Sequence, residues 1–547
     1  MVKEGTLKEG TLNDYTEHNS MLPKRAVGPS LITYNVALEA WRRGISLQFY
    51  TVPVKNRMRI FYLLEHEGKS YKFQYSLGGK VESEARKIVN DKALTKQHLS
   101  AAGVSVPQGK SVDISNGVDD SLQYAAGLGY PVVAKPTDGR LGKGVLTNLT
   151  NENELRDALN HLKDNLGYTD IIIEQYIKGD DTRVYVIDDK VAAAYKRIPL
   201  NVYGDGVSTI SELVDEKKRV RKNNPYAKKH EIVINETVLA YLDSQGYSID
   251  TVPEEGQRIL LAEKTLSSDA GEKIDITEEL SDKMKQTAID AVKAVPGMFM
   301  SGLDLMIDHE RNEGFVLELN ANPNIAGHLY PMEGKPRDVH KFIIDHYFPE
   351  TINKSLEKNE HFVYDFDGII DILKSGAVKS VTVPPLPKGR LKAVELNITG
   401  GSDRLMTWIH QRAVTQRLGG EVLKIGNEEF VVRIAGRNVK VNDFMSALKQ
   451  RITSSTHLKI SNDNELIGLY PYYFKRIGEM PVIKTSAAYS RATPTKEKTS
   501  KADLKKIKAE ENKNQMLSKE LQNMKNSKSW QATAPLRKLM SKVNKNK

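Results

Sequence analysis

Two carboxylates and an amide lie in neighbouring apolar stretches of FMSGLDLMIDHERNEGFVLELNANPN, residues 299 to 324. Asp304 is in the first stretch, and Glu318 and Asn320 are in the second, with a charged turn between them. We expect a hairpin, in which residues two apart share one face. Facing oxygen ligands suit magnesium, which keeps several waters and bridges nucleotide phosphates. The alternative, a structural pair of acids, is less favourable because buried carboxylates without a cation repel each other and lose hydration.

A lysine and several glycines follow an apolar strand in YPVVAKPTDGRLGKGV, residues 130 to 145. Lys135 supplies a point charge, and Gly139 and Gly142 allow backbone N–H groups to close around phosphate oxygens. A third glycine, Gly144, stands where a P-loop has Ser or Thr, so the segment is not a Walker motif. Taken alone, the pattern fits a phosphate-binding loop and a plain hairpin about equally well.

Charged residues also interrupt apolar strands in DIIIEQYIKGDDTRVYVIDDKVAAAYKRIP, residues 170 to 199. Glu174 and its main chain could face a flat aromatic ligand such as adenine. Asp181 and Arg183 are two apart and share a face, and Arg197 ends the next strand. Phosphates or carboxylates are natural partners for such cations, whereas each charge taken singly fits the surface of a hairpin.

Alternating strands and helices must position these segments. Residues 26 to 80 read as a helix leading into a strand, followed by a hairpin whose turn is near Glu67-Gly68. A single helical stretch at 82–103 comes next, and strands and helices then alternate to about residue 350. The proline-rich segment VTVPPLPKGRLK, residues 382 to 392, marks a boundary.

The order strand, helix, strand, strand, helix after this boundary predicts a small ferredoxin-like α+β domain. The last part of the chain is rich in Lys, Glu, Asn, Ser and Thr, which predicts disorder or a lone helix. The predicted divisions are a region at 1–82, a main domain at 83–352, a linker at 353–390, a small domain at 391–475 and a basic, largely disordered tail at 485–547.

Composition narrows the classes of function. The 547 residues include no cysteine, which excludes disulfides, thiolate catalysis and cysteine-bound zinc. The first thirty residues show no secretory signal, and the chain has no uncharged apolar run near ~18 residues, so we expect a cytoplasmic protein. Residues 491–547 hold 16 basic and 5 acidic side chains, which leaves 64 basic and 65 acidic in the rest. The neutral body argues against nucleic-acid binding, and the basic tail suits an anionic membrane or polymer surface.

Several motifs occur in order over about half the chain and resemble one family. They include NDKALTKQHLSAAGVSVPQG, VVAKPTDGRLGKGV, EQYIKGDDTRVYVID, NVYGDGVSTISELV, SGLDLMI and ELNANPNIAGHLYPMEGKPRDV. Together they resemble the ATP-grasp carboxylate–amine ligases, in particular the ATP-grasp domain of cyanophycin synthetase and of the bifunctional glutathione synthetases. The resemblance implies an ATP-grasp fold of the α+β and α/β class, with ATP and magnesium, or manganese in its place, as cofactors.

The resemblance also implies a role for individual residues. Lys92 and Lys135 would contact the ATP phosphates, and Asp304, Glu318 and Asn320 would hold the metal ions. Arg183 and Arg197 would stabilise the transferred phosphoryl group, with Asn322 beside the metals, because phosphoryl transfer depends on positioned cations. The lid over the phosphates would be Asp138, Gly139, Gly142, Lys143 and Gly144, and the adenine edge would be Glu174, Gln175, Tyr176 and Ile177.

The chain also departs from this family. The arginine-containing run of the family that ends in NxSTGG reads LLAEKTLSSDAG here, with Ala262 in place of the arginine. The domain at 391–475 resembles acylphosphatase, but Met406 stands near the position of the catalytic arginine, so we interpret it as non-catalytic. The segment SKSWQATAPLRKLMSK near the end of the chain resembles terminal segments of bacterial cell-surface polysaccharide proteins.

Two hypotheses follow. The favoured one is an ATP-dependent ligase that joins a carboxylate to an amine through an acyl phosphate, acting on an amino acid, a peptide or a cell-surface polymer precursor. The alternative is an ATP-binding scaffold of a bacterial envelope-polymer system that has lost catalysis. In both we expect a homo-oligomer.

Overall fold

The computed structural model describes residues 12–15, 22–55, 57–137, 144–262, 271–352, 359–463, 466 and 468–477, all within the unit Met1–Glu479. The basic tail predicted to be disordered lies outside the described residues. None of the described helices is long and apolar enough to cross a membrane.

An antiparallel sheet with the strand order β17-β1-β2-β3-β4 forms the N-terminal region. Its strands are β1 (Ser46–Val54), β2 (Arg57–His66), β3 (Lys69–Gln74), β4 (Leu77–Gly78) and β17 (Ser380–Val383), accompanied by helices α2 (Pro29–Arg42) and α12 (Phe366–Lys374). The predicted hairpin is confirmed, because His66 pairs with Lys69 across the turn Glu67-Gly68. Both turn residues have positive φ (46° and 80°), as the two-residue turns that match strand twist require.

The predicted helical stretch at 82–103 is wrong in one respect, because it is two helices. They are α3 (Ser83–Asn90) and α4 (Lys92–Ala101). Asp91 separates them: its backbone is extended, and its carboxylate accepts a hydrogen bond from the N–H of Leu94 (3.0 Å) as the N-cap of α4. A helix-capping residue therefore fixes the first residue of α4 at Lys92.

A four-stranded sheet follows in the order β5-β8-β6-β7. Its elements are β5 (Gly109–Asp113), α5 (Asp119–Leu128), β6 (Val132–Pro136), β7 (Leu146–Leu149), α6 (Glu152–Asn160), the π-helical turn His161–Asn165 and β8 (Asp170–Gln175). Its own apolar core includes Leu122 of α5, Leu155 of α6 and Ile171 of β8. The β6–β7 pair shows that the lysine-and-glycine segment connects two paired strands of one sheet.

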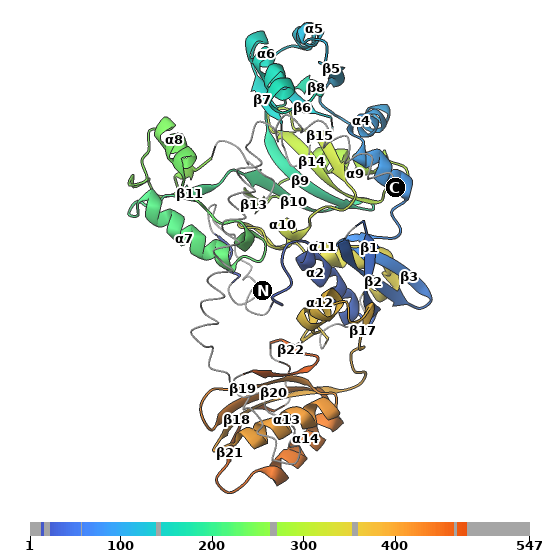
Figure 1. The fold of residues 1–547 in the computed structure, drawn as a ribbon, viewed down its shortest axis with the longest axis vertical. Helices are drawn as coiled ribbons and strands as arrows, with labels where there is room; N and C mark the ends of the chain where they lie inside the picture. The colour runs from blue at the N-terminus through green and yellow to red at the C-terminus, as the bar shows by residue number, and fades with distance from the viewer. Residues whose placement is uncertain are drawn as a thin grey trace, which may run out of the picture. The chain divides into compact units, whose positions relative to one another are not determined.

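The largest sheet of the main domain has the order β13-β10-β9-β14-β15, and every neighbouring pair is antiparallel. Its strands are β9 (Asp180–Ile187), β10 (Lys190–Ile198), β13 (Glu272–Asp275), β14 (Met300–Asp308) and β15 (Glu313–Asn320), with helices α9 (Asp282–Lys293), α10 (Ala326–Leu329) and α11 (Val339–Tyr347). The predicted hairpin at 299–324 is confirmed as β14–β15, which the ribbon shows beside β9 (Figure 1).

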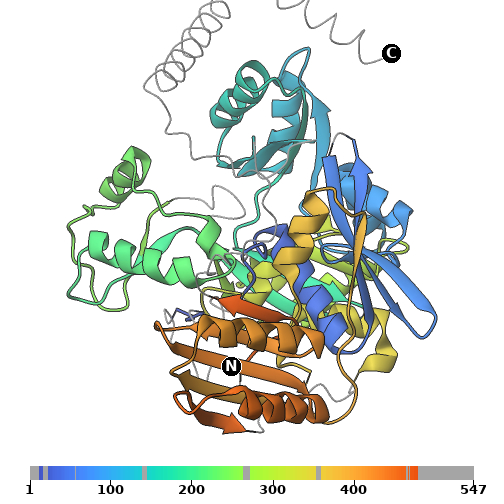
Figure 2. The same ribbon diagram turned by 60° about the horizontal axis from the view of Figure 1, so that its bottom comes forward.

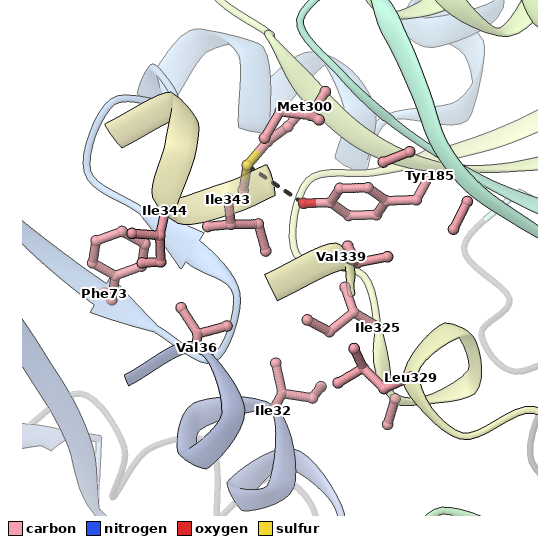
Figure 3. Close-up of a cluster of buried hydrophobic side chains, with 14 of the residues drawn as sticks. Ile32, Val36, Phe73, Tyr185, Met300, Ile325, Leu329, Val339, Ile343 and Ile344 are labelled. Carbon is pink, nitrogen blue, oxygen red and sulfur yellow. Dashed lines mark hydrogen bonds between the residues drawn. The ribbon is translucent and has the colours of Figure 1, made fainter. Parts of the chain in front are cut away.

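A buried apolar cluster joins this sheet to the N-terminal region. Figure 3 shows Ile32 and Val36 of α2 near Ile343 and Ile344 of α11, with Tyr185 of β9 and Met300 of β14 on the sheet side. The Tyr185 hydroxyl donates to the Met300 sulfur at 3.6 Å. The core is therefore continuous from α2 to the strands that carry Arg183 and Asp304.

A separate lobe extends between β10 and β13 in the sequence. It contains β11 (Asn201–Tyr203), α7 (Ile210–Asn223), the 3-10 turn Ala227–Lys229, α8 (Glu236–Ser244) and β12 (Arg258–Leu260), and it has its own small core. Thr209 and Glu212 form a capping box that starts α7.

The C-terminal described region has the strand order β21-β18-β20-β19-β23. Its elements are β18 (Leu391–Thr399), α13 (Asp403–Thr415), β19 (Gly419–Lys424), β20 (Glu429–Arg437), α14 (Asn438–Arg451), β21 (His457–Asp463), β22 (Tyr470–Pro471) and β23 (Phe474–Ile477); β22 pairs with β16 (Phe362–Val363), which follows the 3-10 turn Pro349–Thr351. Helices α13 and α14 lie across one face of the sheet (Figure 2). The βαββαβ order agrees with the ferredoxin-like prediction, while the resemblance to acylphosphatase stays a prediction.

Candidate active site

A pocket of about 290 Å³ lies among α4, the β5-β8-β6-β7 sheet and β15. Four residues predicted from separate segments line it: Lys92, Lys135, Glu174 and Glu318. They come from the start of α4, from β6, from β8 and from β15, respectively. The structure thus brings together the predicted phosphate ligands, the predicted adenine-facing acid and one predicted metal ligand.

A buried carboxylate stands at the centre of the charges in this pocket. Glu174 is 6% exposed, and the Lys135 ammonium donates to its Oε1. A second ammonium, of Lys96, lies 3.4 Å from Oε2. Burial lowers the pKa of Lys96, and the nearby Glu174 opposes that shift. The pair of lysines neutralises an acid that would otherwise be costly to bury.

Lys96 is a functional candidate that the sequence reasoning missed. It follows Lys92 by four residues on α4, so the two side chains lie one turn apart on one face of the helix. This i,i+4 spacing could have identified Lys96, because Lys92 was already expected at the phosphates.

The second cluster of charges joins β9, β10 and β14. Arg183 contacts both oxygens of Asp304, with Nε at 2.6 Å from Oδ1 and Nη2 at 3.2 Å from Oδ2. Arg197 donates to Oδ1 of Asp304, and its Nη1 donates to Oδ2 of Asp181 at 3.2 Å. The side chains of Arg183, Arg197 and Asp304 are 13%, 10% and 16% exposed. This is a compact, largely buried alternation of carboxylates and guanidinium groups.

Burial and mutual attraction set the ionisation of this cluster. Burial lowers the pKa of Arg197, but Asp304 and Asp181 outweigh it, and the net pKa is raised. Burial raises the pKa of Asp181, although Arg197 opposes the change. His328 is 2% exposed with its ring 4.5 Å from that of Tyr195, and burial, then Arg183 and Arg197, hold its pKa well below the usual range. The histidine is therefore a neutral side chain beside two fixed cations, in keeping with the structural role expected for it.

The predicted metal ligands have the right chemistry for magnesium. Asp304 lies directly opposite Glu318 in the β14–β15 ladder, and Asn320 lies opposite Gly302 two positions further along. These side chains offer only oxygen atoms, which Mg²⁺ prefers. Arg183 and Arg197 nevertheless already pair with Asp304, so the acid is not held as an isolated carboxylate.

Another cluster of possible metal ligands lies away from these strands. Among the residues that the structure describes, it is the one group of at least three His, Asp or Glu side chains whose ligand atoms are close together: His66, Glu67 and Glu350. The carboxylate of Glu350 is engaged by Lys69 at 2.8 Å.

Other predicted residues occupy structural positions. Asn322 accepts a hydrogen bond from Ser76 (3.1 Å) and donates to the carbonyl of Gln74 (3.2 Å), so its amide ties the end of β15 to the β3–β4 turn. The catalytic role that the resemblance implies for it stays a prediction.

The predicted adenine edge is only partly in the pocket. The N–H groups of Gln175 and Tyr176 donate to the carbonyls of Gln108 and Pro131, at 2.8 and 3.1 Å, and Ile177 lies in the link to β9. Of these predicted residues, Glu174 lines the pocket.

Little of the predicted glycine lid belongs to the described part of the chain. Gly144 has φ 75°, and a Cβ there would lie 2.9 Å from the Cγ of Pro136, so the position requires glycine. Asp138, Gly139, Gly142 and Lys143 lie outside the described residues.

Comparison with known families gives this arrangement a context. Residues 89–221 match the RimK-like ATP-grasp domain. The chain carries an ATP-grasp domain. The matched residues of the ATP-grasp domain include Lys92, Lys96, Lys135 and Glu174, and they end before Asp304.

Relatives extend the similarity beyond the matched part of the ATP-grasp domain. Cyanophycin synthetase of Trichormus variabilis is 30% identical over 334 residues, which is 59% of this chain and 35% of the relative. The bifunctional glutathione biosynthesis protein of Desulfotalea psychrophila is 31% identical over 319 residues, 55% of this chain and 39% of the relative. The chain is homologous to both proteins and spans little more than a third of their length.

A solved structure is also similar. The bifunctional glutathione synthetase from Pasteurella multocida is 26% identical and covers 53% of this chain and 40% of its own, with a TM-score of 0.43.

Proposed function

We propose that the chain is an ATP-dependent carboxylate–amine ligase. ATP transfers its γ-phosphoryl group to a carboxylate, an amine attacks the acyl phosphate, and an amide, ADP and phosphate are the products. The observation that carries the proposal is the convergence of Lys92, Lys135, Glu174 and Glu318 on one pocket in a chain that carries an ATP-grasp domain.

The cations have distinct tasks in this reaction. Lys92 and Lys135 bind the polyphosphate, and the remaining lining of the pocket excludes water from the nucleotide. Arg183 and Arg197 stand where they can stabilise charge on the transferred phosphoryl group, because positioned cations do most of the work in phosphoryl transfer. Asp304, Glu318 and Asn320 would hold magnesium, which neutralises charge on the phosphates when it is bound.

The substrates belong to the amino acids, peptides or cell-surface polymer precursors. Ala262 replaces an arginine of the family pattern, so we expect the carboxylate to differ from that of the relatives. Cyanophycin synthetase and the glutathione proteins are more than twice as long as their matched parts, which leaves the products of this chain open to a direct screen.

A screen of amino acids and short peptides in pairs, read out as ADP release, tests the proposal. ADP should form only when a carboxylate and an amine are present together, and Lys135→Ala and Asp304→Ala should abolish it. Lys87→Ala is the matched control, because its side chain is 72% exposed on α3 and pairs only with Glu84 among the printed contacts of the described residues.

Two outcomes of this screen would contradict the ligase. Failure of the wild-type chain to bind ATP would refute the proposal. ATP binding without ADP release, together with cellular function that survives Lys135→Ala and Asp304→Ala, would instead support the scaffold.

A further inference from the structure

The two lysines that pair with Glu174 come from different parts of the pocket wall. Lys135 is on β6, next to β8 in the same sheet, whereas Lys96 is on α4 and reaches Glu174 across the pocket. The ion pairs therefore connect the helix to the sheet through one buried carboxylate. Their side chains are 15% and 26% exposed, against 8% for Glu174, so solvent screens the group only partly.

The proposed function requires Lys135 to serve two anions. It pairs with Glu174 in this structure, yet it is also the lysine expected at the ATP phosphates. A lysine ammonium is a compact charge on a flexible stem and can move between partners. If Lys135 leaves Glu174, the acid keeps its charge in a buried place, and an uncompensated buried charge is strongly unfavourable.

We propose that Lys96 is a positioning residue that neutralises Glu174 while Lys135 turns to the phosphates of a bound nucleotide. This inference rests on the proposed function, because it assigns a task to Lys96 in the same pocket. It also gives Glu174 a reason to be ionised there: the acid holds α4 against β8 through Lys96, and so keeps the pocket wall in place.

The surroundings of Lys96 support a fixed role on α4. The helix begins at the Asp91 cap, and the Thr95 hydroxyl donates to the carbonyl of Ile88 at 2.7 Å, which attaches α4 to α3. Leu99, on the same helix, is 2% exposed and lines the pocket. Lys96 therefore extends from a rigid element towards Glu174.

Nucleotide affinity of full-length variants tests the inference. We would measure the Kd of ATP by calorimetry and the kcat and KM of the ligase reaction. Lys96→Met should raise the Kd and KM for ATP by about tenfold and leave kcat within about threefold. Lys96→Arg should stay within about twofold of wild type, because it retains the cation. The exposed Lys87→Met serves as a matched loss of a lysine and should leave the Kd unchanged.

A double variant separates this role from direct phosphate binding. Glu174→Gln removes the charge that Lys96 neutralises, so the double variant Lys96→Met/Glu174→Gln should bind ATP more tightly than Lys96→Met alone. If Lys96 contacted phosphate directly, the loss would persist in the double variant, and the inference would be overturned. The double variant also decides the matter should Lys96→Met fail to fold, because it carries no unpaired acid.

The inference and the proposed function fail in different ways. Wild-type affinity for ATP in Lys96→Met would overturn the inference alone. Absence of ATP binding by the wild-type chain would overturn both.

Discussion

Two carboxylates of the ATP-grasp domain, Glu174 and Asp304, each lie between two cations, but the cations differ in kind. Lys96 and Lys135 flank Glu174, and Arg183 and Arg197 flank Asp304. An ammonium group is a mobile point charge, whereas a guanidinium group is a planar fork that fits a carboxylate in a fixed geometry. The lysine cluster is therefore suited to exchange partners when a ligand enters, and the arginine cluster is suited to hold its geometry throughout.

The largest effect should come from the arginine cluster. Asp304→Asn removes the charge that Arg183 and Arg197 share, and we expect ADP release to fall by about 10³-fold. A coupled assay of ADP checks this result. Asp119→Asn is the control, because that carboxylate is 86% exposed and should give wild-type turnover. Turnover of Asp304→Asn within threefold of wild type would mean that the cluster has no part in the reaction.

Removal of the mobile lysine should have the next largest effect. Lys135→Met loses the expected phosphate ligand, and we expect kcat/KM for ATP to fall by about 100-fold. Steady-state kinetics at varied ATP concentration provide the measurement. A change confined to the amine or carboxylate substrate would place Lys135 outside the nucleotide site.

Exchange of the two kinds of cation tests the comparison itself. Arg197→Lys keeps the charge but loses the fork between Asp181 and Asp304, and we expect kcat to fall about 30-fold. Lys96→Arg, the reverse exchange at Glu174, should stay near wild type. Equal effects of the two exchanges would show that the clusters do not differ in the way that we describe.

The smallest effect should come from the helix caps. Asp91→Ala and Asn151→Ala each remove an N-cap, of α4 and of α6, and each should lower the free energy of unfolding by about 1 kcal/mol. Only Asp91→Ala should also weaken ATP binding, because α4 lines the pocket and α6 does not. Thermal unfolding and calorimetry together measure the two effects.

The strands and the ligand types could be read from the sequence because both depend on short-range patterns. Alternation and a turn at Glu67-Gly68 predicted the β2–β3 hairpin, and two charged stretches predicted β14–β15. The break at Asp91 was missed because the helical periodicity on its two sides obscured a single capping residue.

The ion pairs could not be predicted because they join strands that are distant in the sequence. The sequence placed Asp304 at a metal and Arg183 at a phosphate, but β9 lies beside β14 only in the folded sheet, where the two residues face each other. Lys96 was likewise missed because its partner, Glu174, is 78 residues away.

A crystal structure of the full chain with a non-hydrolysable ATP analogue and Mg²⁺ tests the central claim most directly. We predict the polyphosphate at Lys92 and Lys135, with the Lys135 ammonium moved from Glu174 to a phosphate oxygen and Lys96 still paired with that acid. An analogue bound elsewhere, or bound in this pocket with its phosphates away from both lysines, would contradict the account.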